Sequence, residues 1–412
     1  MANLTLELWR SSKRNRKYAR NIWLLYGISF FNGMHFVYAL LIPYFVDWGG
    51  ITFPQIMNLQ SIYMITIFLT EIPLGVVSDC VSRKLSLSLG FLITIAAILF
   101  YSAIPRFFLF VIAEILWACA TSLISGADRA LMYDSLIKLT WKNKERNSSN
   151  SVSVFGKYTS FNLIGFLISA PIGTIISIYM GLRATMMFMI IPAGIAFIST
   201  LFLIEPVKLK DRMTKPYLKL IFSGFQSIWK NTGFRTLVLD DLIVICLCNH
   251  VGFSYQQKLR ILGISDSNFG WIFMIYIIFT IVGSNIHTPL VKKFHNRRKI
   301  LFFTTLGAGM GLIILFLSNT LLWMIIGMIL VATFGITYAT VRMGYYQSYI
   351  SSDQRSTIIS TINMIRLLWL SGINILVGFL SKIDLSLVFI IFGGVLSIWA
   401  FISPIKEEYL KN

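Results

Sequence analysis

Long apolar runs alternate with short polar links along almost the whole chain. An α-helix of about 20 mostly apolar residues crosses the hydrocarbon core of a bilayer, whereas polar and charged links stay outside that core. We therefore expect twelve transmembrane helices, at residues 21–45, 54–77, 85–104, 107–131, 152–179, 184–204, 236–255, 269–290, 300–317, 321–348, 357–380 and 385–402.

The polar linker between the sixth and seventh runs carries a second pattern. Apolar residues recur in it at the spacing of one helix face, at Leu218, Ile221, Phe222, Phe225, Ile228 and Trp229. Lys219 and Lys230 lie nearby. A basic helix with one apolar face settles in the membrane interface, so we expect this helix on the inner membrane surface.

The composition supports an integral membrane protein. The 412 residues are 56% hydrophobic and 13% charged, whereas a soluble domain has about 25% charged residues. In a soluble protein a net charge of +19 would suggest nucleic acid, but here the bases stand in the links. We expect contacts with membrane lipids and no nucleic-acid partner. The four cysteines lack disulfide or zinc spacing, and we expect no cofactor and no metal.

Lysine and arginine are distributed unequally between the links. Of the 36 Lys and Arg residues, 27 fall in links and tails on one side of the predicted spans, five on the other side and four within spans. Cytoplasmic loops carry the excess of these bases. We therefore expect a multi-pass protein with both termini in the cytoplasm.

The same pattern divides the chain into five segments. We expect two six-helix bundles, joined by a cytoplasmic linker that contains the amphipathic helix and flanked by two cytoplasmic tails. The segments are the basic tail 1–20, the first bundle 21–204, the linker 205–233, the second bundle 234–403 and the tail 404–412.

The two bundles resemble each other at equivalent positions. A shift of 213 residues places Arg129 on Arg342 and residues 133–137 on residues 346–350. A shift of 214 aligns the link after the second span with the link after the eighth, matching Gly75 to Pro289, Asp79 to Lys293, Arg83 to Arg297 and Lys84 to Arg298. The second copy keeps the bases and loses the acid. We interpret this as a repeat of parallel halves; the alternative is chance likeness between apolar helices.

One short link carries a specific motif. Residues 75–84 have the spacing Gly-x-x-x-Asp-x-x-x-Arg-Lys, and they follow Glu71-Ile72-Pro73. A short cationic link between two spans lies on the cytoplasmic side. This spacing resembles the signature loop between helices 2 and 3 of the major facilitator superfamily of transporters.

Two further stretches carry the resemblance. Residues 125–136 resemble a bacterial subgroup of that superfamily in which a second acid stands where Arg129 stands here. Span 5 contains Gly156, Gly165, Pro171 and Gly173, which approximate the Gly/Pro motif of exporting members with the proline displaced by one position. The resemblance covers the whole chain. It implies an all-α protein of the bacterial inner membrane, with 12 transmembrane helices in two pseudo-symmetric six-helix bundles around a central cavity.

The resemblance also implies a gate at the signature loop. There the acid sits near the start of helix 11, where a helix N-terminus favours a carboxylate, and the loop clamps the outward-facing state. The arginine engages an acid at the end of span 4, for which Asp128 and Asp134 are both suitable. The implied gating set is Gly75, Asp79, Arg83, Lys84, Asp128 and Asp134. The alternative is that Arg83 and Lys84 only enforce topology.

Ionisable residues inside spans are functional candidates, because each costs roughly 2.5–3.5 kcal/mol to insert. The candidates for proton coupling are Glu71, Glu114, Asp240, Asp241, His35 and His250. Adjacent helix positions face about 100° apart, so at most one of the two aspartates faces a cavity squarely. Structural pairing of Glu114, solvation of the aspartates at the interface, and simple hydrogen bonding of the histidines are the alternatives.

Bases and aromatic residues in the spans are candidates for a substrate cavity. Arg366 stands about ten residues into span 11, near mid-membrane, where it faces a carboxylate or an anionic substrate group. The other candidates are Arg342, Lys157, Tyr38, Tyr63, Trp117 and Trp369. A structural ion pair is the alternative for Arg366, and snorkelling to the interface is the alternative for Lys157 and Arg342.

The leading functional hypothesis is a secondary transporter that works by alternating access. We expect a monomer that exports a small amphiphilic organic compound, such as a drug, siderophore or peptide-like antibiotic, in exchange for protons. No P-loop occurs, so ATP is not the direct drive. Uptake of an organic anion or metabolite is the alternative. A multi-pass enzyme is remote, because the four histidines are dispersed, and we expect no enzymatic activity.

Overall fold

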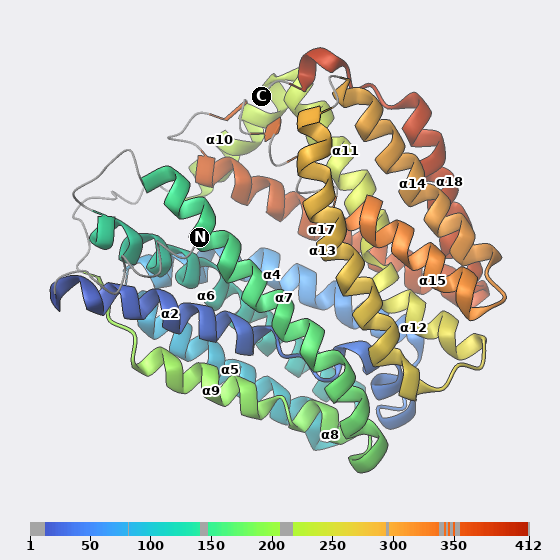
Figure 1. Cartoon of the computed structure of the whole chain (residues 1–412). Helices are drawn as coiled ribbons and strands as arrows, with labels where there is room; N and C mark the ends of the chain where they lie inside the picture. Colours follow the sequence, from blue (N-terminus) through green and yellow to red (C-terminus); the bar gives the residue numbers. More distant parts are fainter. Residues whose placement is uncertain are drawn as a thin grey trace. The chain divides into compact units, whose positions relative to one another are not determined.

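A computed structural model describes residues 13–80, 82–140, 147–206, 217–293, 296–337, 342, 345–346, 349–350 and 355–410. Every regular element among these residues is a helix (Figure 1). Contacts between Cα atoms divide the chain into two compact units. We call them unit 1, which is Met1–Ala39 with Thr66–Arg212, and unit 2, which is Leu40–Ile65 with Met213–Asn412.

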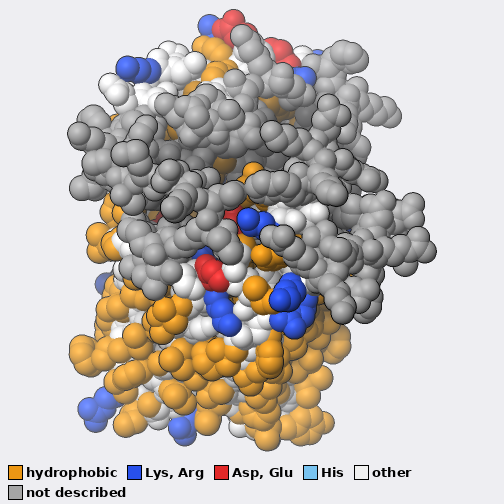
Figure 2. Space-filling view, turned by 90° about the vertical axis from the view of Figure 1, so that its left-hand side faces the viewer, with side chains coloured by type: hydrophobic (Ala, Val, Ile, Leu, Met, Phe, Trp, Pro, Cys, Tyr) orange, Lys and Arg blue, Asp and Glu red, His pale blue; other side chains and the backbone are white. Residues whose placement is uncertain are grey.

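The helices have the length and surface of membrane spans. Within the described residues, ten helices are long and apolar enough to cross a membrane, and Leu321–Ile336 is a shorter apolar one. Large apolar side chains such as Phe108, Leu322 and Phe401 lie exposed, and hydrophobic side chains cover most of the described surface visible in Figure 2. A water-soluble protein rarely exposes such an area. The expected all-helical, multi-pass membrane fold is therefore confirmed.

Unit 1 is built around helices from the first half of the chain. α5 packs on α6 and α9, and α2 packs on α6, α7 and α9. The helices are α2 (Lys13–Gly33), the part of α4 (Phe53–Cys80) after Ile65, α5 (Arg83–Ala103), α6 (Phe107–Thr140), α7 (Asn147–Met180), α8 (Leu182–Met187) and α9 (Ile190–Leu201).

Unit 2 contains the second half of the chain and the stretch Leu40–Ile65. In it α14 packs on α15 and α18, and α17 packs on α10, α11 and α18. The elements are α3 (Leu41–Pro43), η2 (Tyr44–Trp48), the part of α4 up to Ile65, α10 (Tyr217–Lys230), α11 (Thr232–Asn249), α12 (Val251–Ile261), η4 (Asp266–Asn268), α13 (Phe269–Lys293), α14 (Arg297–Leu317), α15 (Leu321–Leu330), η5 (Val331–Ile336), α17 (Arg355–Ile383), α18 (Leu385–Ile402) and η6 (Glu407–Tyr409).

The stretch Leu40–Ile65 is held in unit 2 by polar contacts. The backbone N–H of Ile42 donates to the Gln256 side-chain oxygen at 2.9 Å. Ser61 Oγ donates to the backbone carbonyl of Ser371 at 3.0 Å. An ion pair of 2.6 Å joins Asp47 to Arg260. These bonds satisfy backbone and side-chain groups that would be costly to leave unpaired in a membrane protein.

The signature link differs from the loop that the sequence suggests. α4 continues through Gly75 as far as Cys80, and α5 begins at Arg83, so only residues 81–82 separate the two helices. Ser82 caps α5 by accepting a hydrogen bond from the backbone N–H of Leu85 at 3.1 Å. Charged residues end the apolar run without interrupting the i to i−4 hydrogen bonds of a helix. The polarity pattern therefore marks where the span ends and not where the helix ends.

Three predicted spans are interrupted. In the sixth span, α8 ends at Met187 and α9 begins at Ile190. α2 ends at Gly33, and helical structure resumes only at the 3₁₀ turn η1 (Tyr38–Leu40). The seventh span likewise consists of α11 and α12 with His250 between them. Interrupted spans are tolerated in membranes where the freed backbone is buried in protein or lines a cavity. The apolar pattern alone does not distinguish such a break from a continuous helix.

The linker helix is confirmed as a helix, α10. Its Ile228 is fully buried, whereas Phe225 and Trp229 are 42% and 45% exposed and stack on each other with ring centroids 4.9 Å apart. α10 packs against α17 and α11, which agrees with the burial of Ile228. Its place on the membrane surface stays a prediction, favoured by the exposed aromatic pair.

Glycines in α7 allow it to pack closely against α2 and the chain just after it. A Cβ atom added at Gly165 would overlap the backbone carbonyl of Phe30, and one added at Gly173 would overlap that of Phe36. Small residues let helix backbones approach closely in membranes. Two of the glycines in the fifth-span motif therefore have a packing role in this chain.

Replacing Gly165 or Gly173 by alanine should destabilise unit 1 by about 1–3 kcal/mol, because the added methyl group cannot fit without separating the backbones. The melting temperature and the folded yield of the detergent-purified variants measure this. Gly156→Ala in the same helix is the matched control, because no heavy atom lies within 4 Å of its added Cβ. Wild-type melting of Gly173→Ala would disprove the packing role.

Candidate functional site

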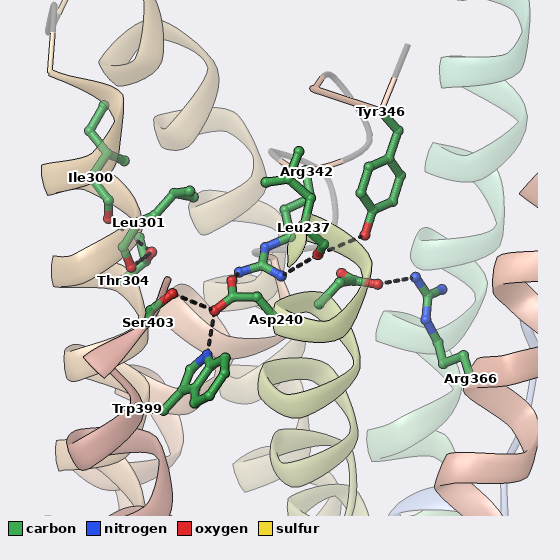
Figure 3. A network of polar contacts seen from close by, with 11 residues as sticks. Leu237, Asp240, Ile300, Leu301, Thr304, Arg342, Tyr346, Arg366, Trp399 and Ser403 are labelled. Atoms are coloured by element: carbon green, nitrogen blue, oxygen red, sulfur yellow. Dashed lines mark hydrogen bonds and ion pairs between the residues drawn. The ribbon is translucent and has the colours of Figure 1, made fainter. Parts of the chain in front are cut away.

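α11 carries two adjacent acids in the interior of unit 2. The helix starts at Thr232, where the Asn231 side chain caps it by accepting the backbone N–H of Phe234 at 3.0 Å. Two turns later stand Asp240 and Asp241, which are 1% and 0% exposed. Adjacent positions on a helix point about 100° apart, so the two carboxylates reach different neighbours. Figure 3 shows Asp240 beside Arg342.

Asp240 lies in an enclosed network. It forms an ion pair with Arg342, whose side chain is also fully buried. It accepts hydrogen bonds from the indole N–H of Trp399 and from Ser403 Oγ, the latter at 3.3 Å. Arg342 also donates to the backbone carbonyl of Leu237 at 3.2 Å. Arg342 therefore does not snorkel to the interface.

Asp241 forms the second ion pair, with Arg366 on α17 at 2.6 Å. The carboxylate is fully buried, whereas 23% of the Arg366 side chain is exposed. Arg366 also donates to Asn363 Oδ1, one turn earlier, at 3.3 Å. The bases of the two ion pairs thus differ in solvent exposure, since Arg342 is enclosed and Arg366 reaches an accessible surface of unit 2.

The interfacial solvation considered for these aspartates is wrong, because both are buried and both are paired with bases. Removing two ions from water costs several kcal/mol per ion, and only good geometry with further hydrogen bonds offsets that cost. Losing one partner then leaves a buried charge without compensation. Such pairs hold their helices together while both charges persist, and they weaken when one charge is removed.

His250 follows α11 and is 1% exposed. Its ring meets Phe392 edge-on with centroids 4.9 Å apart, and Phe389 lies at 6.0 Å. This aromatic surrounding favours a packing role.

Arg83 and Asp128, two of the expected gating residues, form separate contacts in unit 1. Arg83 forms an ion pair with Asp134 and donates to the Ala130 carbonyl at 3.1 Å. Asp128 instead accepts a hydrogen bond from the hydroxyl of Tyr158. Of the two acids considered as the partner of Arg83, the structure therefore selects Asp134. The side chain of Asp79 lies outside the described part of the chain.

Lys84 and Gly75 have simpler surroundings. The Lys84 ammonium donates to the Leu201 carbonyl at 2.7 Å, at the end of α9. Gly75 has no heavy atom within 4 Å of an added Cβ. A lysine at the C-terminal carbonyls of a helix is favourable, so Lys84 braces α5 against α9.

A glutamate caps the third predicted span of each half, α5 in unit 1 and α14 in unit 2, and the sequence reasoning missed both glutamates. Glu205 accepts hydrogen bonds from the backbone N–H groups of Arg83 and Lys84 at 3.0 and 2.9 Å. Glu407 accepts from those of Arg297 and Arg298 at 2.9 and 2.8 Å. A carboxylate at a helix N-terminus is stabilising. The available signal was the repeat, since each glutamate follows the last span of its half.

The C-terminal segment is fixed near this second cap. The hydroxyl of Tyr349 donates to the backbone carbonyl of Tyr409 at 2.8 Å, and Arg297 donates to that of Leu410. Burial raises the pKa of the Tyr349 phenol above its usual value near 10, so this hydroxyl remains a proton donor at neutral pH.

The other predicted residues have different surroundings. His35 and Trp117 line a cavity of about 250 Å³ inside unit 1, together with Asp128 and Tyr158. Tyr38 packs edge-on against Phe166 with centroids 5.6 Å apart. The remaining predicted residues differ in burial: Glu114 is buried, Glu71, Lys157 and Tyr63 are half-buried, and Trp369 is exposed.

The fold and the buried charges point to one class of protein, a helical membrane transporter. A family model described as Major Facilitator Superfamily matches residues 22–259 and 251–408. The chain belongs to this superfamily, and it is a transporter and not an enzyme.

Solved transporter structures share the fold. The nucleoside transporter NupG matches with a TM-score of 0.74 and 14% identity, covering 93% of this chain and 97% of that chain. A POT family transporter in complex with 5-aminolevulinic acid matches with a TM-score of 0.75 and 13% identity, covering 95% and 97%. At these identities the likeness establishes the fold alone. No curated protein matches the chain.

Removing one partner of the enclosed pair should be far more damaging than removing both. Arg342→Met leaves the Asp240 charge buried without compensation, and we expect a loss of about 3–5 kcal/mol of stability. The double variant Asp240→Asn/Arg342→Met should recover most of it. Thermal unfolding in detergent measures both. Asp384→Asn is the control, since Asp384 accepts one backbone N–H as the exposed cap of α18. A double variant as unstable as the single one would contradict this account.

Proposed function

We propose that this transporter exports a small amphiphilic organic compound in exchange for protons, and that the Asp241–Arg366 ion pair couples the two movements. The proposal adds direction, coupling and substrate class to the membership of the superfamily. The observation that carries it is the asymmetry of this pair, in which a fully buried carboxylate holds a base that is partly exposed.

Protonation of Asp241 would change the interactions of α17. A protonated carboxyl group has no charge to hold the guanidinium, so Arg366 would be released and α11 and α17 would lose their ion pair. Deprotonation would restore it. A pair that forms and breaks in this way is a two-state element that both protons and substrate can bias. Buried intramembrane acids commonly mark proton pathways.

Asp240 is less suited to this role. It accepts hydrogen bonds from Trp399 and Ser403 in addition to its ion pair with Arg342. Several hydrogen-bond donors around a carboxylate stabilise its ionised form. The guanidinium group of Arg342 is also wholly enclosed. We therefore assign the Asp240–Arg342 pair to holding the helices of unit 2 together.

Because an acid balances the charge of each arginine, an amphiphilic substrate is favoured over a simple anion. Arg342 and Arg366 each have an acid partner, so neither is poised for an anion while both acids are ionised. Uptake of an organic anion remains the second candidate, because protonation of Asp241 would free Arg366 to bind a carboxylate. Export is favoured by the Gly/Pro pattern of the fifth span.

The proposal also includes three expectations from the sequence. They are that both termini lie in the cytoplasm, that the membrane is a bacterial inner membrane and that the protein is a monomer. The contact between Arg83 and Asp134 is proposed as part of the cytoplasmic gate, and Lys84 with Glu205 as the brace that keeps α5 in place. Glu71, Glu114 and His35 remain further candidates for proton transfer.

Proteoliposomes with a pH gradient test the coupling. We expect wild-type protein to accumulate an amphiphilic dye or a peptide-like compound from a screened panel, and a protonophore to abolish the accumulation. The neutral double variant Asp241→Asn/Arg366→Gln should still exchange compound across the membrane but no longer accumulate it. The matched control is Asp47→Asn/Arg260→Gln, which neutralises another 2.6 Å ion pair of unit 2 and should keep accumulation.

Two results would count against the proposal. Full accumulation by the Asp241→Asn/Arg366→Gln protein would make that pair structural. Movement of organic carboxylates together with protons, in place of exchange, would favour the second candidate.

The gate can be tested separately. Arg83→Gln and Asp134→Asn each remove one charge of the cytoplasmic ion pair, and we expect severalfold slower exchange because the closed state loses a contact. The swap Arg83→Asp/Asp134→Arg should restore part of the rate. Initial rates in proteoliposomes measure this, with the exposed Lys230 changed to Gln as a surface control. If both single variants insert in the correct orientation and exchange at the wild-type rate, Arg83 and Asp134 have no role in gating, and the charge of Arg83 serves only to set the membrane topology.

A further inference from the structure

Unit 1 contains a cavity that the coupling pair does not explain. Its volume is about 250 Å³, and it lies between α2, α5, α6, α7 and α9. It is smaller than the pockets of about 300–1,000 Å³ that hold drug-sized ligands, which favours a compact occupant.

One end of the cavity presents negative charge. Asp128 lines it and is 5% exposed. Its carboxylate accepts hydrogen bonds from the Tyr158 hydroxyl and from the backbone N–H of Arg129, which leaves lone pairs for a further donor. The C-terminal end of α2 is also at the cavity, since Asn32 and His35 line it. The negative end of a helix dipole favours a cation.

Aromatic side chains line another part of the cavity. Trp117 and His35 both line it, with ring centroids 5.8 Å apart, and His35 stacks on Phe166 at 4.8 Å. Trp117 precedes Asp128 on α6 by about 16 Å along the helix axis. These rings therefore give that part of the cavity an apolar lining and do not contact a group bound at Asp128.

Positive charge lines the cavity as well. Arg129 follows Asp128 on α6, is exposed, and also lines the cavity. Arginine presents a fork of donors that matches a carboxylate or phosphate. The acid and the base together give the cavity no excess formal charge, so it complements a ligand that carries both signs.

We propose that this cavity binds a compact zwitterion, with its ammonium group at Asp128 and its anionic group at Arg129. This inference rests on the proposed transport function and narrows its substrate class to molecules about the size of an amino acid. It also gives Arg129 a role, although its position is one where the resemblance leads us to expect a second acid. Asp128 then belongs to a binding site, in keeping with its separation from Arg83.

Matched probes test the charge requirement on the purified full-length protein. The probes are leucine, its methyl ester as the cation, N-acetyl-leucine as the anion and N-acetyl-leucinamide as the uncharged form, with the same four forms of glycine and phenylalanine to vary size. Binding is measured by calorimetry and by the shift in melting temperature. In at least one series the zwitterion should bind about tenfold or more tightly than its cation and its anion, since each charged hydrogen bond is worth about 1.5–3 kcal/mol.

Two variants should each remove the preference for one charged group of the ligand, the ammonium group in the first and the anionic group in the second. Asp128→Asn, whose amide oxygen can still accept from Tyr158, should lose about tenfold or more in affinity for the zwitterion but not for the N-acetyl anion. Arg129→Gln, at an exposed position where folding is not at risk, should bind the methyl ester as well as the zwitterion. Arg106→Gln, which is exposed and outside the cavity, should behave like wild type.

Three outcomes would overturn the inference. The first is that no zwitterion of the three series binds. The second is that the methyl ester binds wild-type protein as tightly as the zwitterion, which would indicate a site for simple amines. The third is that neither Asp128→Asn nor Arg129→Gln changes selectivity.

The two proposals fail separately. If zwitterion binding depends on Asp128 and Arg129 but no proton-driven accumulation occurs, the binding site stands and the proposed coupling does not. If proton-driven accumulation is found for compounds that do not compete with the zwitterion, the coupling stands and the site is wrong.

Discussion

The organisation of unit 2 depends on two carboxylates at adjacent positions of α11. Because neighbouring residues on a helix point about 100° apart, Asp240 and Asp241 bind bases on different elements, one in the tenth predicted span and one on α17. A single helix thus ties two others to itself by charge in a setting where unpaired charge is costly. The enclosed pair has further hydrogen-bond donors, whereas the base of the other pair is partly exposed. In the proposed function the first pair holds the helices together and the second pair separates when Asp241 is protonated.

Much of the fold was predictable from the sequence. The apolar runs located the spans, and α18 has the predicted bounds. The runs could not locate helix ends: α4 passes through the signature link to Cys80, because charge ends a membrane span without breaking a helix. They also could not reveal the break after Gly33, because an interrupted span is as apolar as a continuous one.

The candidate site was predictable in its members and not in its pairings. Intramembrane charge identified Arg342 and Arg366, because any base within a span demands a partner. Which acid meets which base depends on helix rotation, and the sequence sets that only through packing. Trp399 and Glu205 gave no signal as single residues. The cavity beside Asp128 was equally hidden, since it arises where α2 stops short and five helices fail to fill the space.

The central claim is that Asp241 takes up a proton when its ion pair with Arg366 breaks. Infrared difference spectroscopy of the purified protein, between neutral and acidic solution, tests this most directly without a substrate. The account predicts a carboxylic-acid carbonyl band that develops on acidification, disappears in Asp241→Asn and persists in Asp134→Asn. A spectrum of Asp241→Asn with the same bands as wild type would contradict it.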